Sequence, residues 1–293
     1  MHRLLTGSLT VDRLTIPIVD LPPALDGTTI VQLSDLHYDG KRLSDGLLRQ
    51  TIEATNQAEP DLVVITGDFV TDDPTPIHSL ALQLKHIRSR AGVCAILGNH
   101  DLHRRSSRAT ITEALTRIDV SVLWDQVVYP LGEGLAIVGL PEYWSPDFKT
   151  SRVLDRVPQE VPRIVLAHNP DCAEFLQQWR VDLQLSGHTH GGQIVIPGLG
   201  NVSALSAKLY SRLPPRNRNR LPFLRACYRV MKHWEWSQGL YQIGDNRLYV
   251  NRGLGTYFPG RLFCPPEVTV ITLVRNLLEK PDCHCYLSES LDV

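Results

Sequence analysis

Short apolar, β-branched segments recur along the chain, and most of them end abruptly in a polar loop. The segments are only a few residues long and do not alternate cleanly between apolar and polar positions. This pattern predicts strands that are buried on both faces. The predicted strands are Ile30–Ser34, Leu62–Thr66, Val93–Leu97, Leu135–Gly139, Ile164–Ala167, Leu183–Ser186, Gln193–Ile196, Leu248–Asn251 and Val268–Val274.

Helical patterns lie between several of these strands, at Leu43–Gln57, Ile77–Arg90, Ser107–Ile118 and Cys172–Trp179. Strands that alternate with helices predict a layered α/β fold. The later strands follow one another without full helices between them, so we expect an antiparallel or mixed sheet to complete a sandwich. Because no linker divides the chain, residues 1–280 are predicted to form a single domain, followed by a C-terminal tail at 281–293.

One stretch interrupts this order, and we interpret residues 198–238, approximately, as an insertion in the domain. No Asp or Glu occurs from Gly191 through Trp234. The basic residues of this stretch are Lys208, Arg212, Arg216, Arg218, Arg220, Arg225, Arg229 and Lys232.

The end of the insertion, Pro222–Trp236, is predicted to be an amphipathic helix with an apolar side and a basic side. Such a helix could lie on an anionic membrane surface. It could also cap the phosphate of a substrate, or pack on the sandwich with its arginines merely solvated. All three alternatives are carried forward. The residues expected to contact a membrane are Arg225, Arg229, Lys232 and Trp234.

Composition and charge narrow the function classes only slightly. The formal net charge of -1 indicates no general affinity for nucleic acid, so an acidic partner would have to meet a local patch. Asp12 and Arg13 interrupt the N-terminal stretch before a signal peptide or membrane span could form. The cysteines form no CxxC pair, which favours reduced thiols and a cytoplasmic location, peripheral to the membrane if the insertion binds lipid. Cys283-His284-Cys285 is half of a metal-site pattern, but we expect it to be part of a frayed tail.

The residues that can carry chemistry follow the predicted strands directly. Loops at the carboxyl ends of buried strands are where open α/β sheets build their sites. One such piece alone is typical of a turn or a helix cap, whereas five pieces offering carboxylate, imidazole and carboxamide groups predict one shared metal site. The pieces are Asp35-Leu36-His37, Gly67-Asp68, Gly98-Asn99-His100-Asp101, His168-Asn169-Pro170 and Gly187-His188-Thr189-His190.

This series of motifs, D-x-H, GD, GNH[DE], H and GHxH in that order, resembles the calcineurin-like metallophosphoesterase superfamily. The resemblance extends from Asp35 to His190, and every motif is intact. It implies a four-layer α/β/β/α sandwich, here with a basic helical insertion. Three downstream segments are similar to the subgroup of YkuE-like and YaeI-like phosphodiesterases, namely Gly191-Gly192-Gln193, Gly253-Leu254-Gly255 and Pro266-Glu267.

The resemblance also implies a role for each residue of the motifs. Asp35, His37 and His190 would hold a first metal ion, Asn99, His168 and His188 a second, and Asp68 would bridge both. Two dications, two carboxylates and a bridging hydroxide leave a charge of about +1 to stabilise a phosphoryl group. A ligand set rich in imidazole and free of thiolate suits Mn²⁺, Fe²⁺/Fe³⁺, Zn²⁺ or Co²⁺.

Two further residues are expected to act beside the metals. His100 would lie on the leaving-group side as a general acid or charge stabiliser. Asp101 would pair with the other ring nitrogen of His100, although it could equally cap the helix that follows.

We therefore expect a dinuclear metal-dependent phosphoesterase that cleaves a phosphodiester or pyrophosphate bond. Some relatives act on UDP-2,3-diacylglucosamine, a lipid A precursor, so a lipid-linked substrate is the leading interpretation. A nuclease or nucleotide phosphodiesterase would use the basic insertion to bind phosphates, but the chain has no separate domain to grip a duplex. A scaffold with a decayed metal site is disfavoured, because His37, His100, His168, His188 and His190 are all present.

Overall fold

The computed structural model describes residues 6–214 and 221–276. The predictions made for Arg216, Arg218, Arg220 and the tail at 281–293, including Cys283-His284-Cys285, lie outside the described residues.

The first of two large sheets is mainly parallel. Strands β2, β3, β4 and β5 pair in parallel in chain order, while β14 runs antiparallel to β2 and parallel to β1. Because parallel strands point the same way, the loops that follow β2, β3 and β4 meet at one edge of the sheet. In spatial order the strands are β1 (Thr10–Val19), β14 (Glu267–Asn276), β2 (Thr29–Leu33), β3 (Leu62–Ile65), β4 (Val93–Ala95) and β5 (Val120–Val122).

The second sheet has a parallel centre and antiparallel borders. Strands β7, β8, β9 and β13 pair in parallel, and β6 and β12 run antiparallel at the two edges. The predicted mixed sheet is thus confirmed. In spatial order its strands are β12 (Gly239–Ile243), β13 (Asn246–Val250), β9 (Leu183–Ser186), β8 (Arg163–Leu166), β7 (Ala136–Gly139) and β6 (Gln126–Val128).

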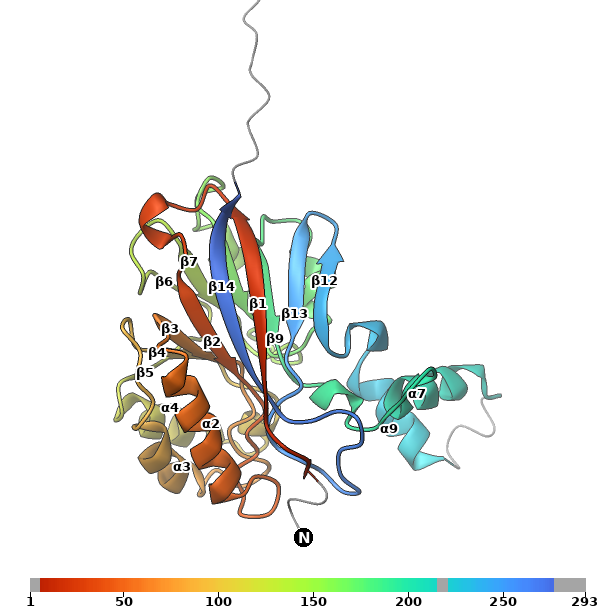
Figure 1. The fold of residues 1–293 in the computed structure, drawn as a ribbon. Coiled ribbons are helices and arrows are strands. Elements are labelled where there is room, and N and C mark those ends of the chain that lie inside the picture. The colour runs from red at the N-terminus through yellow and green to blue at the C-terminus, as the bar shows by residue number, and fades with distance from the viewer. Residues whose placement is uncertain (1–5, 215–220, 277–293) are drawn as a thin grey trace, which may run out of the picture.

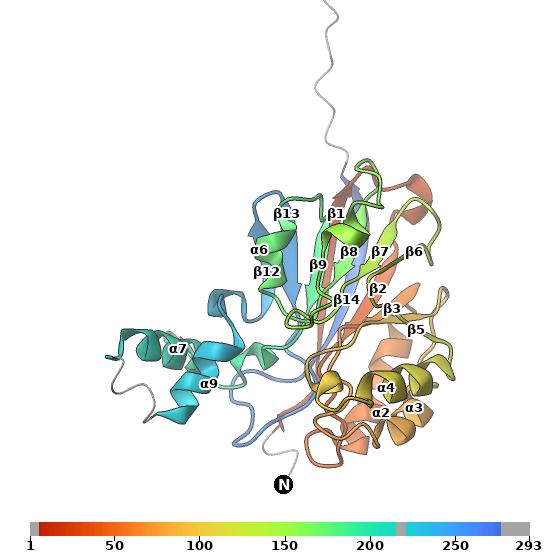
Figure 2. The same cartoon turned by 180° about the vertical axis from the view of Figure 1, so that it is seen from behind.

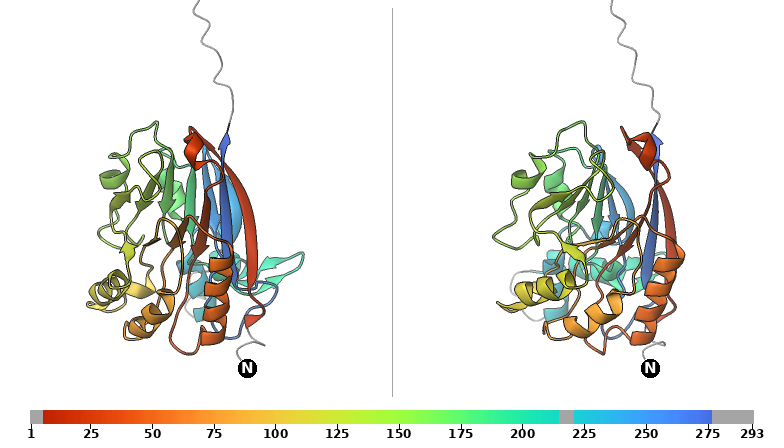
Figure 3. Two further views of the ribbon diagram at one scale, coloured as in Figure 1. Left: turned by 60° about the vertical axis from the view of Figure 1, so that its left-hand side comes forward. Right: turned by 90° about the vertical axis from the view of Figure 1, so that its left-hand side faces the viewer.

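The sheets stack face to face, and helices cover both outer faces (Figures 1, 2 and 3). Helices α2 (Asp45–Gln57), α3 (Ile77–Leu84) and α4 (Ser107–Thr116) cover the first sheet, and α5 (Ser151–Leu154) and α6 (Cys172–Leu176) cover the second. Each interface has its own buried apolar cluster, and the cluster between the sheets joins Ile30 and Val64 to Ile164 and Leu185. The expected four-layer α/β/β/α sandwich is confirmed.

Several local features differ from the predictions. Strand β1 was not predicted, because only Ile16 and Ile18 of its ten residues are buried and because it includes Pro17, which an edge strand tolerates. The predicted strand Gln193–Ile196 is reduced to a short pair, β10 (Val195–Ile196) with β11 (Gly200–Asn201). Helix α3 ends at Leu84, because the Asn56 side chain binds the backbone of His86 and Arg88 and holds that stretch in a turn.

The insertion forms a pair of helices, α7 (Val202–Arg212) and α9 (Pro222–Val230), which projects from the sandwich (Figures 1 and 2). The single predicted helix Pro222–Trp236 is wrong, since α9 ends at Val230 and a separate 3₁₀ turn, η4, spans Trp234–Trp236. The chain leaves the helix where the backbone N–H groups of Lys232 and His233 donate to the Asp171 carboxylate, at 2.7 and 3.0 Å.

This break changes the surface that was expected to face a membrane. Trp234 is buried with Cys227 and Met231 in a cluster between the two helices, and the Lys232 ammonium lies 2.7 Å from a carboxylate oxygen of Glu174. Arg225 and Arg229 remain exposed, and a membrane contact through them stays a prediction. Within the described residues, no helix combines the length and the apolar character needed to cross a bilayer.

Candidate metal centre

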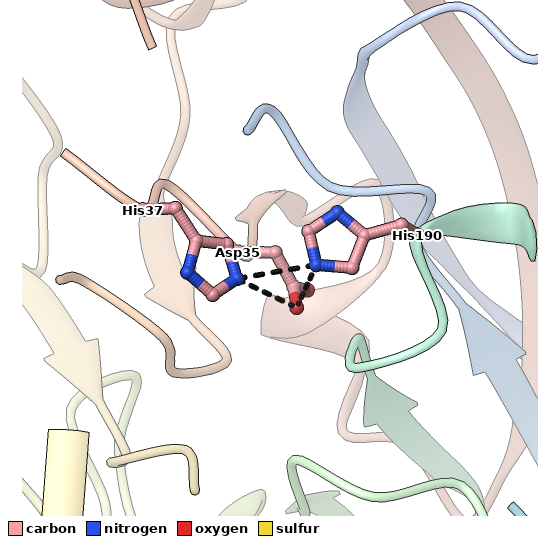
Figure 4. Close-up of side chains that lie close together, drawn as sticks. All are labelled: Asp35, His37 and His190. Atoms are coloured by element: carbon pink, nitrogen blue, oxygen red, sulfur yellow. Dashed lines mark hydrogen bonds and ion pairs between the residues drawn. The ribbon is translucent and has the colours of Figure 1, made fainter. Parts of the chain in front are cut away.

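Three of the expected ligands converge from distant parts of the chain, as Figure 4 shows. Asp35 and His37 follow β2, and His190 follows β9. Their ligand atoms all lie within 4.8 Å of one another, and all three residues are buried. His190 Nε2 lies 3.1 Å from His37 Nε2 and 3.4 Å from Asp35 Oδ1. We call these residues the first trio.

Asp68, His168 and His188 form a second buried trio with the same spacing limit of 4.8 Å between ligand atoms. His168 Nε2 lies 3.2 Å from Asp68 Oδ2 and 3.3 Å from His188 Nδ1. The same Asp68 oxygen is also 3.4 Å from His37 Nε2 in the first trio. One carboxylate therefore reaches both trios, as a bridging ligand must.

Asn99 provides an independent test of whether the site fits metal ions. Among the described residues, its side-chain oxygen is buried and has no hydrogen-bond partner. Buried polar atoms are nearly always paired, so an unpaired carbonyl oxygen needs an explanation. Next to it, the backbone N–H of His100 donates to Asp68 Oδ1 at 2.9 Å. An amide oxygen left free beside a buried group of carboxylates and imidazoles fits a cation ligand, so the residues present fit a metal centre.

The backbone of these loops is strained at the candidate ligands themselves. A positive φ, at 44–70°, occurs at Asp35, His37, Asp68, His188 and His190. For residues other than glycine this left-handed region costs about 1–2 kcal/mol each, and such strain concentrates at functional sites.

Two motif glycines let the backbone approach the ligands. A Cβ at Gly98 would lie 2.2 Å from Asp68 Oδ1, and one at Gly187 would lie 2.2 Å from Asp35 Oδ2. Any side chain at either position would push a ligand carboxylate out of place, which explains the glycine in each of these two motifs.

Electrostatics prepare the imidazoles for binding a cation. Burial lowers the pKa of His37, His188 and His190 to about 3 each, so these rings are neutral and have a lone pair to donate. Burial also acts to lower the pKa of His168, but the charge of Asp68 and its hydrogen bond outweigh this effect and raise that pKa to about 10. A bound cation would take the place of the proton that His168 shares with Asp68.

His100 stands at the border of the first trio, and its ring centroid lies 4.9 Å from that of His37. Its Nδ1 lies 2.9 Å from the carbonyl oxygen of Thr71, so Nδ1 carries a proton and donates it to that carbonyl. Nε2 is then the nitrogen that faces the site. The Asp72 carboxylate lies nearby, with Oδ1 at 3.8 Å from Nδ1.

Asp101 does not lie where the sequence analysis expected it. Its carboxylate accepts the backbone N–H groups of Val70, at 3.2 Å, and Gly98, at 3.0 Å. The carbonyl oxygen of Thr71, and not Asp101, contacts Nδ1 of His100, so the expected pairing of Asp101 with His100 is wrong. Burial and the charge of Asp68 raise the pKa of Asp101 to about 8. Through its hydrogen bonds to Val70 and Gly98, Asp101 ties together the loops that follow β3 and β4.

Comparison with known proteins agrees with this geometry. The family model described as calcineurin-like phosphoesterase matches residues 28–192, more than half of the chain. The chain belongs to the calcineurin-like phosphoesterase family. Members of this family are metal-dependent phosphoric ester hydrolases, and this chain is one of them.

Relatives of this phosphoesterase are similar over most of their length. The uncharacterized metallophosphoesterase YkuE of Bacillus subtilis is 33% identical, over 86% of this chain and 81% of its own. The phosphodiesterase YaeI of Escherichia coli is 29% identical, over 84% of this chain and 82% of its own. UDP-2,3-diacylglucosamine pyrophosphatase LpxG of Chlamydia muridarum is 26% identical, over 84% of each chain. The expected similarity to YkuE-like and YaeI-like proteins is confirmed.

The structure adds neighbours of the phosphoesterase site that sequence reasoning missed. The Tyr257 hydroxyl lies 3.1 Å from His37 Nδ1, and the Trp144 ring packs edge-on against His188 with centroids 5.3 Å apart. The ring nitrogen Nε2 of His188 lies 3.1 Å from the carbonyl oxygen of Val230, at the end of α9. Only Tyr257 had a signal, since it closely follows the Gly253-Leu254-Gly255 segment. The other two are brought in by the fold alone.

Proposed function

We propose that this phosphoesterase hydrolyses a phosphodiester or pyrophosphate bond at a dinuclear metal centre, and that its substrate is lipid-linked. The observation that carries the proposal is the pair of buried trios that share Asp68. In this proposal the first trio holds one ion, and His168 and His188 hold the other together with Asn99. The ions would be Mn²⁺, iron, Zn²⁺ or Co²⁺, which imidazole-rich sites favour.

Paired cations supply positive charge that activates water and stabilises the phosphoryl oxygens during in-line displacement. The protein residues perform the remaining tasks. Asp68 keeps the two halves of the site at a fixed spacing. His100 is already oriented by Thr71, so its Nε2 can deliver a proton to the leaving oxygen when the ring is protonated.

The nature of the relatives supports a diester or pyrophosphate substrate. One similar protein is named a phosphodiesterase, and another is named a UDP-2,3-diacylglucosamine pyrophosphatase. We infer that a substrate of the second kind, with an acylated sugar on a pyrophosphate, is the leading candidate. The competing candidate is nucleic acid, which would use the exposed Arg225 and Arg229 to bind phosphates.

The test is metal analysis combined with a substrate panel. Protein reconstituted with Mn²⁺ should contain two ions per chain and hydrolyse bis-p-nitrophenyl phosphate, and a chelator should abolish this activity. UDP-2,3-diacylglucosamine should be cleaved faster than p-nitrophenyl phosphate or single-stranded DNA. A well-folded sample that binds one ion or none would contradict the dinuclear centre. Preferred cleavage of DNA would favour the nuclease alternative instead.

A further inference from the structure

A large cleft separates the insertion from the sandwich. Its volume is about 1080 Å³. The residues of α7, α9 and η4 form one wall, and Tyr143 and Trp144, in the loop after β7, contribute to the opposite wall. A cavity of this size matches those that hold small organic ligands.

This large cleft lies next to the metal centre, on the side of the second trio. Trp144 lines the cleft and also packs against the ring of His188. On the insertion side, Met231 lines the cleft, and the preceding carbonyl of Val230 contacts His188 Nε2. Residues at both walls therefore contact His188, so the cleft lies directly beside the second trio.

The walls combine uncovered apolar surface with positive charge. Large apolar side chains remain partly exposed there, including Trp144 at 49%, Leu205 at 41%, Tyr228 at 48% and Leu199 at 66%. Exposed apolar side chains gathered around one hollow mark a binding surface. Three cationic residues, Lys208, Arg229 and Lys232, line the same cleft together with two acidic ones, Asp171 and Glu235, and Lys232 is paired with Glu174. The cleft thus offers mainly apolar surface, with Lys208 and Arg229 available to a negatively charged group of an amphiphilic ligand.

The opposite side of the centre has a different chemistry. His100 and Tyr257 border the first trio, and a smaller cleft of about 560 Å³ begins at Tyr257. Charged side chains are more frequent in this second cleft, with five of its eleven lining residues against five of twenty-one in the large cleft, and they include Lys41, Arg42 and Asp72. In the proposed function His100 protonates the leaving group, so the leaving group lies on this polar side. The large cleft, on the other side of the centre, is then available to the substituent that stays on the phosphorus.

We propose that the large cleft is a subsite for an apolar chain. This chain is carried by the substituent that stays attached to the phosphorus after cleavage. This proposal rests on the proposed function, since it assigns the leaving group and the retained substituent of the substrate to the two sides of the same metal centre. It identifies the substrate class as an amphiphile, with a polar leaving group on the His100 side and a hydrocarbon chain between the insertion and Trp144.

A chain-length series tests the subsite. We would compare methyl, butyl and octyl p-nitrophenyl phosphodiesters, all below their aggregation concentrations, so that only the retained chain changes. The value of kcat/KM should rise with chain length, by up to about fourfold for each methylene that is fully buried. Equal kcat/KM values for the three diesters would overturn the subsite. Turnover of the methyl ester would in that case still uphold the proposed function.

A variant and its matched control localise the effect to the large cleft. Leu205→Asp places a charge in the apolar wall and should reduce the octyl-to-methyl ratio of kcat/KM by at least about tenfold. Leu82→Asp makes the same change on α3 at a position that is 60% exposed and is not part of the cleft, and it should keep the wild-type ratio. An unchanged ratio in Leu205→Asp would also overturn the subsite.

Binding measured without turnover separates the two hypotheses. Calorimetry with the Mn²⁺-loaded protein should show tighter binding of octyl phosphonate than of methyl phosphonate, and Leu205→Asp should remove most of the difference. If the phosphonates behave in this way but no diester is hydrolysed, the subsite stands and the proposed function falls. If both phosphonates bind equally, the subsite falls whatever the kinetics show.

Discussion

The metal centre and the α7–α9 insertion are held together by different kinds of contact. The residues of the two trios are buried, and each follows a strand of one of the two sheets. The described part of the insertion instead has one small buried cluster, Ala207, Cys227, Met231 and Trp234, and is tied to the sandwich by contacts such as that of Asp171. A region with few buried contacts opens at a lower free energy than the core does.

This difference assigns separate tasks to the two regions. A centre that must hold cations in a fixed arrangement needs the rigid edges of two sheets and tolerates backbone strain to achieve it. The wall of a substrate-binding cleft can be less rigid, because a few exposed side chains are enough to recognise the chain and the headgroup of a substrate. The contact between Val230 and His188 is the point where the two regions meet. The predictions below act on the centre, then on its border, and then on the insertion.

The largest effect is expected from Asp68→Ala, because this carboxylate contacts both trios. Without its charge, the buried imidazoles cannot retain a pair of cations. We expect fewer than two Mn²⁺ ions per chain and a fall in diester hydrolysis of about 10³-fold or more. Metal analysis and steady-state kinetics provide the measurement. Asp147→Ala, at an exposed carboxylate, is the control and should bind both ions. Two tightly bound ions in Asp68→Ala would rule out the bridging role.

An intermediate effect is expected from His100→Asn, at the border of the centre. This change removes the proton donor but no metal ligand, so both ions should remain bound. Hydrolysis of a diester with a poor leaving group should fall by about 10²–10⁴-fold, as is typical when a general acid is lost. The loss should be much smaller for p-nitrophenolate, which hardly needs a proton.

His103→Asn is the matched control for this prediction. His103 is a neighbouring exposed imidazole whose Nδ1 lies 2.6 Å from the Asp72 carboxylate. It should retain the wild-type dependence on the leaving group. If His100→Asn lost the same factor with good and poor leaving groups, His100 would stabilise charge without delivering a proton.

The smallest effect is expected from Asp171→Asn, which acts on the insertion. Lys232 and His233 donate to different oxygens of Asp171, so the amide keeps only one of the two acceptors and also loses the negative charge. A hydrogen bond to a charged group contributes about 1.5–3 kcal/mol. Hydrogen exchange in residues 222–236 should become faster. Mn²⁺ affinity should fall by about tenfold or less, because the Val230 carbonyl orients His188 less firmly.

The control for this prediction is Glu174→Gln, which removes the exposed ion pair with Lys232 and the longer contact with His233 but leaves the Asp171 carboxylate in place. Exposed pairs contribute little, so this variant should exchange and bind Mn²⁺ like the wild type. Unchanged exchange in Asp171→Asn would show that Asp171 does not hold the insertion. Faster exchange with unchanged Mn²⁺ affinity would show that the insertion and the centre are independent.

Sequence patterns predicted the sandwich well where the determinants are local. Strands such as Leu62–Ile65 are short, apolar and buried on both sides, so composition alone identifies them. Strand β1 escaped notice because it lies at the edge of its sheet and is half exposed. The end of α9 could not be predicted either, since Asp171, from a distant loop, supplies the hydrogen bonds that replace the helical ones.

For the site, the sequence by itself determined which side chains are available and in what order they follow the strands. The motifs place a carboxylate, imidazole or carboxamide at the end of a buried strand, and parallel strands bring such ends to one edge. Only the tertiary structure decided which way each side chain turns and what lies beside it. The Asp101 carboxylate accepts hydrogen bonds from the backbone of Val70 and Gly98, while Trp144 and Val230 contact His188. Such contacts join residues far apart in the chain, and their energies depend on packing that no local pattern encodes.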